Sequence, residues 1–123
     1  MTKISKNLLL FFSIATAVIY FSSCEKHTYE IKPPEVNPDI LFSQDIQPVF
    51  DAKCVSCHRG SQVPDLRPEN SYRALSDGGY LKSPVEESVL YKYVFVETSH
   101  SAFTNQEEKN KIFSWISLGA EDN

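Results

Sequence analysis

The pattern of hydrophobic and polar positions divides the chain into three stretches. Apolar residues dominate from Leu8 to Phe21, a run of fourteen residues. The stretch that follows, up to Leu41, is polar, contains three prolines within residues 33–38 and shows little periodicity. Beyond it, apolar residues recur at intervals of three and four, which is the spacing of amphipathic helices. This pattern predicts an N-terminal signal, a linker and one small helical domain.

The domain is predicted to begin with a helix over residues 42–54. Pro48 fits the first turn of this helix or marks its start, because proline lacks the amide hydrogen that a helix interior needs. The apolar positions that share one face are Ile46, Val49, Phe50 and Cys54. We expect this face to point toward the site that Cys54 helps to form, which is described below.

Two later helices carry capping signals. The segment 83–86 offers a serine cap, a proline in the first helical position and a glutamate that completes a capping box. Thr104 and Glu107 form a second capping box, and the helix that follows ends at Gly119.

The segments between these helices are predicted as loops. Residues 59–83 contain many Gly, Pro, Ser and Asp residues, with one helical turn at Ser71–Leu75 for which Asn70 is the cap. Residues 97–103 form a second loop. Since no strong strand signal flanks these segments, the predicted fold class is all-α, with three to four short helices.

The segment Cys54-Val55-Ser56-Cys57-His58 is typical of a c-type haem attachment site. Each cysteine sulfur can add across one haem vinyl group, and His58 is then the proximal iron ligand. The competing interpretations are half of a zinc site, which needs four ligands, and a thioredoxin-like redox pair, which needs a βαβ setting. We favour one covalently attached haem c, around which the short helices pack.

The N-terminal stretch is typical of an export signal. Lys3 and Lys6 precede an apolar run that is too short to span a bilayer comfortably. The sequence Phe21-Ser22-Ser23-Cys24 resembles a bacterial lipobox, although Phe21 stands where an aliphatic residue is commoner. This resemblance predicts a signal peptide at residues 1–23, lipidation of Cys24, a linker over 24–41 and a domain over 42–123. The alternatives are an uncleaved anchor helix and a soluble secreted protein.

These features place the protein in the bacterial cell envelope, anchored to a membrane by lipid on Cys24 and facing the periplasm or the exterior. The net charge of −4 argues against nucleic acid as a partner.

From Phe42 to Asn123 the chain resembles a class I cytochrome c domain of the lipoprotein-anchored type. The residues that carry the resemblance are the motif at 54–58, the segments 45–50 and 64–67, Trp115-Ile116 and Gly119-Ala120. The resemblance implies that the first and last helices cross, with Trp115 or Phe113 packed near the crossing.

One departure concerns the sixth iron ligand. Class I domains supply a methionine from a loop just before the last helix, but the only methionine here is Met1. The corresponding loop carries His100, which we favour as the second axial ligand. An open site remains an alternative, as does ligation by Lys53, Lys92 or Lys109.

The resemblance therefore predicts a mono-haem cytochrome that transfers electrons between redox protein partners, and neither an enzyme nor a protein with a small-molecule substrate. Two other functions remain open. A haem with an open distal site would bind small ligands or act as a sensor, and a haem that only fills space would belong to an accessory subunit of a larger envelope complex.

Overall fold

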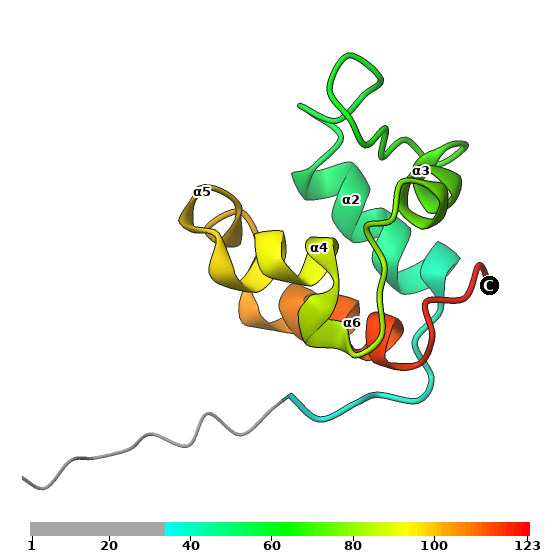
Figure 1. Cartoon of the computed structure of the whole chain (residues 1–123), viewed down its shortest axis with the longest axis vertical. Coiled ribbons are helices and arrows are strands. Elements are labelled where there is room, and N and C mark those ends of the chain that lie inside the picture. Colours follow the sequence, from blue (N-terminus) through cyan, green and yellow to red (C-terminus); the bar gives the residue numbers. More distant parts are fainter. Residues whose placement is uncertain (1–33) are drawn as a thin grey trace, which may run out of the picture. The chain divides into compact units, whose positions relative to one another are not determined.

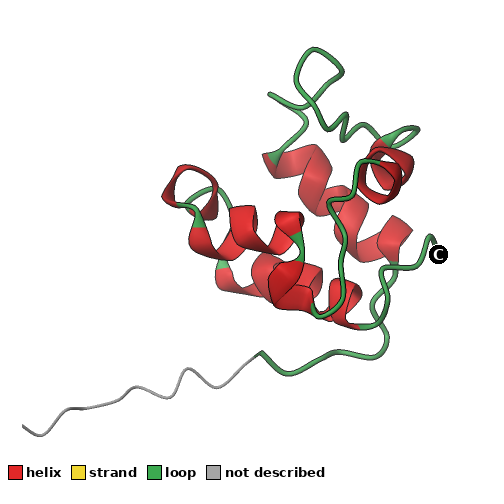
Figure 2. Cartoon of the chain, viewed as in Figure 1, coloured by secondary structure: helices red, strands yellow, loops and turns green. Residues whose placement is uncertain are grey.

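The computed structural model of the chain describes residues 34–123. The predicted signal peptide, the lipidation site Cys24 and most of the predicted linker lie outside the described residues. Within the described part, the chain forms helices, turns and loops without a β-strand (Figure 2), so the all-α prediction is confirmed. No helix in this part of the chain has the length and apolarity needed to cross a membrane.

The helical elements are short and are joined by turns and loops (Figure 1). In chain order they are η1 (Phe42–Ile46), α2 (Gln47–Lys53), α3 (Ser71–Asp77), η2 (Val85–Glu87), α4 (Val89–Tyr91), η3 (Lys92–Val96), α5 (Thr98–Ser101) and α6 (Gln106–Ser117).

The predicted first helix is present as η1, a π-helical turn, continued by α2 with Pro48 in its first turn. The first backbone N–H groups of a helix lack hydrogen-bond partners within the helix. Here the C-terminal residue, Asn123, supplies partners for two of them. Phe42 N donates to Asn123 Oδ1 at 2.7 Å and Ser43 N donates to Asn123 O at 2.9 Å. The start of η1 is thereby bonded to the residues that follow α6.

Part of the predicted linker packs on the domain. The side chain of Ile40 is only 5% exposed and belongs to the hydrophobic core. Asn37 N donates a hydrogen bond to the hydroxyl of Ser114, which lies in α6. Packing thus begins a few residues before residue 42, where the prolines and the lack of periodicity had placed the boundary.

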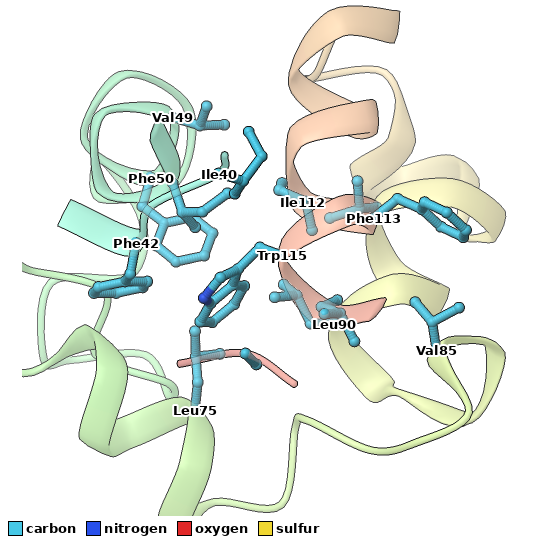
Figure 3. Packing of buried hydrophobic residues seen from close by; sticks show 14 of the residues in the cluster. Ile40, Phe42, Val49, Phe50, Leu75, Val85, Leu90, Ile112, Phe113 and Trp115 are labelled. Atoms are coloured by element: carbon cyan, nitrogen blue, oxygen red, sulfur yellow. The ribbon is translucent and has the colours of Figure 1, made fainter. Parts of the chain in front are cut away.

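The core lies between η1–α2 and α6, around the indole ring of Trp115 (Figure 3). Its ring centre lies 5.1 Å from that of Phe42, and its Nε1 donates to Glu121 O at 2.9 Å. Ile46, Phe50 and Ile112 are fully buried members of the same core cluster. Trp115, in α6, thus packs against Phe42, in η1.

Three local predictions need correction. The segment 83–86 forms no capping box, because Pro84 precedes a single 3₁₀ turn and α4 starts only after Ser88, whose hydroxyl donates to Tyr80 O. Residues 97–103 are not simply a loop, since they contain α5. The cap of α6 is Asn105 rather than Thr104.

The capping box of α6 is therefore shifted by one residue from the prediction. The Asn105 side chain accepts from Glu108 N, and the Glu108 carboxylate accepts from Asn105 N. The end of the helix is as expected: Gly119 has φ +105°, a conformation that favours glycine.

Candidate functional site

A cavity of about 260 Å³ lies beside the C-terminal end of α2. This volume is just below the range of about 300–1,000 Å³ that is usual for small-molecule sites. Its wall is largely apolar, from Leu66, Leu75, Tyr80, Leu90 and Val94. The lining side chains that carry an amine, thiol, imidazole or hydroxyl group include Lys53, Cys54, Cys57, His58, His100 and Thr104.

The motif at 54–58 reaches this cavity because the chain keeps turning after α2 ends. Cys57 N and His58 N both donate to Cys54 O, at 3.1 and 2.9 Å. The turn brings Cys54, Cys57 and His58 to the lining of one cavity. Both cysteines are free thiols.

The ring of His58 is held in one orientation by the loop that follows it. Its Nδ1 lies 3.1 Å from Pro64 O. A carbonyl oxygen can only accept, so Nδ1 donates, and in the neutral ring the lone pair resides on Nε2. Histidines that bind metals typically make this contact through their other nitrogen. Leu66 N also donates to His58 O at 2.8 Å. This bond joins the end of the loop at residues 59–66 to the residue that precedes it.

His100 faces the same cavity from α5. The ring centres of His58 and His100 are 6.4 Å apart. Metal–imidazole bonds of about 2.0–2.1 Å place the centres of two rings on opposite sides of one metal ion roughly 6–6.5 Å apart. His100 Nδ1 is 2.9 Å from the hydroxyl of Ser99. A hydroxyl can donate or accept, so this contact occupies Nδ1 without fixing which ring nitrogen carries the proton.

These residues fit a covalently bound haem. Two thiols, an oriented imidazole and a second imidazole at the right separation line one apolar cavity. The porphyrin supplies four further donors, so two histidines are enough. Among the described residues, no group of three or more His, Cys, Asp or Glu side chains is arranged to hold a metal ion by itself.

The environment of Cys54 disfavours a redox-active cysteine pair. Burial, followed by the nearby carboxylate of Glu108, raises the pKa of the Cys54 thiol from 9.0 to about 11. Reactive cysteines instead have a lowered pKa, because the thiolate is the nucleophile.

The lysines considered for the sixth ligand position are placed differently. Lys53 lines the cavity, where its Nζ lies 3.5 Å from the Glu108 carboxylate. Lys92 and Lys109 are not among the residues that line it. His100 and Lys53 are thus the two proposed sixth ligands that the fold brings to the site.

Two residues of this region were not assigned from the sequence. Thr104 lines the cavity, and its buried Oγ1 has no hydrogen-bond partner among the described residues. Gln47 is 7% exposed and its side chain bonds to Asp51, Leu66 and Ser71. The signal for Gln47 was present in the sequence, since it lies three residues before Phe50 and seven before Cys54, on the buried face.

Comparison of the chain with protein-family models, with curated proteins and with solved structures finds no match. The function of this chain is therefore inferred from the residues of the site.

Proposed function

We propose that this protein is a membrane-tethered, mono-haem c-type cytochrome that transfers electrons between redox proteins of the cell envelope, on a small cytochrome c-like fold. The observation that carries the proposal is the convergence of Cys54, Cys57, His58 and His100 on one apolar cavity, with the two imidazole rings at the spacing of paired axial ligands.

Each group has a distinct role in this proposal. Cys54 and Cys57 would hold the haem through thioether bonds, and the imidazoles of His58 and His100 would ligate its iron. The haem, when bound, supplies a centre that takes up and releases one electron. The largely apolar wall would surround the haem with non-polar side chains, and the hydrogen bond from His58 to Pro64 O would strengthen the imidazole as a donor. Lipid on Cys24 would hold the domain at a membrane.

The first test is whether haem becomes covalently attached. The chain is produced in a host that matures c-type cytochromes, and haem is detected on the denatured polypeptide. We expect one haem in the wild type and none in the double variant Cys54→Ala/Cys57→Ala. A wild-type chain without covalent haem under these conditions would contradict the proposed function.

The distal ligand is tested by the spin state of ferric iron, read by optical and electron paramagnetic resonance spectra. Two axial imidazoles give low-spin iron, so His100→Ala is expected to become high-spin. Lys53→Ala is the matched control, because Lys53 also lines the cavity, and it should stay low-spin. A low-spin His100→Ala variant would remove His100 from the iron and contradict the assignment.

One observation favours a second function, the binding of small ligands at the distal side. His100 is exposed, and the backbone amides of His100 and Ser101 bond only to the nearby Glu97 O. These bonds span only a few residues of sequence, whereas His58 is bonded to the loop at both Pro64 and Leu66. We therefore expect His100 to be displaced from the iron more easily than His58. Carbon monoxide binding to the reduced wild type would support this function, and the lack of such binding would exclude it.

A further inference from the structure

Both polar atoms of the buried Gln47 side chain are hydrogen-bonded, through three bonds in total. Its Nε2 donates to Asp51 Oδ1 at 2.8 Å and to Leu66 O at 3.0 Å. Its Oε1 accepts from the hydroxyl of Ser71, the first residue of α3, which is also fully buried. A buried amide in this position costs free energy unless every polar atom is paired, and here each one is.

Leu66 connects Gln47 to His58. Its carbonyl accepts from Gln47, while its amide donates to His58 O at 2.8 Å. Two residues earlier along the same loop, Pro64 O accepts from the His58 ring. The loop that orients the imidazole is therefore bonded to His58 on one side and to Gln47, on α2, on the other.

We infer that Gln47 is a positioning residue, which sets the electron-donor strength of the His58 imidazole through the loop at residues 59–66. This inference rests on the proposed function. The Nδ1–H···O bond raises the basicity of a metal-bound imidazole, and a more basic imidazole favours ferric over ferrous iron. Loosening the loop weakens that bond and shifts the midpoint potential upward.

The test uses the haem-loaded protein and the variant Gln47→Met, which keeps the length of the side chain and removes its donors and acceptor. We expect a higher midpoint potential and faster solvent exchange of the His58 Nδ1 proton, followed by nuclear magnetic resonance. Because Gln47→Met leaves the Ser71 hydroxyl unpaired, the double variant Gln47→Met/Ser71→Ala provides the same comparison if the single variant does not fold.

Two controls separate positioning from stability. Ser71→Ala removes the bond to Gln47 Oε1 but leaves the bond to Leu66 O. Ser114→Ala removes a buried hydroxyl that bonds to Asn37 N. Both should lower stability without changing the potential or the proton exchange.

If Gln47→Met and its double variant lose stability but keep the potential and exchange rate of Ser71→Ala, Gln47 is only structural and the inference is wrong. That outcome leaves the proposed function intact, because the wild type would still carry covalent haem.

Discussion

Cys54 and Cys57 belong to one motif but lie in different surroundings. Cys54 is partly buried beside Glu108 and its thiol pKa is raised to about 11, whereas Cys57 is exposed. The shift lowers the thiolate fraction of Cys54 near pH 8 roughly a hundredfold. The two sulfurs should therefore differ in reactivity before haem is attached.

We expect iodoacetamide to modify Cys57 well before Cys54 in the haem-free protein at pH 8. The rate at Cys54 should rise about tenfold for each pH unit up to its raised pKa near 11. Mass spectrometry of the labelled peptides measures both rates. Glu108→Gln should speed the labelling of Cys54, because it removes a charge that raises this pKa. Equal labelling of both cysteines in the native protein would contradict the burial of Cys54.

At the scale of elements, α6 joins the cavity to the core. Its N-terminal cap follows Thr104, which lines the cavity, and its C-terminal half carries Trp115. The reciprocal bonds between Asn105 and Glu108 satisfy two backbone N–H groups at the start of the helix. Fraying of this turn would disturb one wall of the site.

Replacing Asn105 by alanine is expected to lower the free energy of unfolding by about 1 kcal/mol, the usual cost of losing a helix cap. Urea denaturation followed by circular dichroism gives this value. Gln106→Ala is the control, since its side chain makes only an exposed bond to Asn110, and it should change stability by no more than about 0.5 kcal/mol. If both variants have the same stability, the cap contributes nothing to the folded state.

Local signals in the sequence were sufficient for one part of the site. Cys54, Cys57 and His58 lie within five residues of sequence, in one turn, so their common location follows from spacing alone. The cap of α6 was ambiguous, because Thr104 and Asn105 each precede an acidic residue by three positions. The predicted helix start at residue 83 was wrong. The helix α4 begins only after Ser88, whose hydroxyl bonds outside the helix to Tyr80 O.

The remaining features of the site depend on distant parts of the chain. The position of His100 relative to His58 follows from how α5 packs, and no local pattern contains that distance. The contacts of Gln47 with Leu66 and Ser71 bridge 19 and 24 positions of sequence. A polar residue on a buried helix face indicated a partner but could not identify it.

At the scale of the whole molecule, Trp115 is the largest fully buried side chain among the described residues, with only 1% of its surface exposed. A domain of this size has a total stability of only about 5–15 kcal/mol. Removing a large buried aromatic side chain typically costs about 3–5 kcal/mol. A single substitution in this core can therefore consume much of the available stability.

Trp115→Ala should lower the free energy of unfolding of the haem-loaded protein by about 3–5 kcal/mol, or prevent folding. Leu118→Ala, at a position 46% exposed and just beyond the same helix, should have an effect of about 0.5 kcal/mol or less. Urea denaturation followed by circular dichroism compares the two. A Trp115→Ala variant as stable as the control would contradict the central position of the indole ring.

The start of η1 and the C-terminal residue lie together, at a distance from the cavity. Asn37 and Phe42 bond to Ser114 and Asn123, whereas the cavity lies where α2 ends. The 5 residues of η1 and the 7 of α2 separate these regions, which is roughly 18 Å at about 1.5 Å per residue. A short affinity tag or an electrode linker joined after Asn123 would therefore be attached away from the residues that line the cavity.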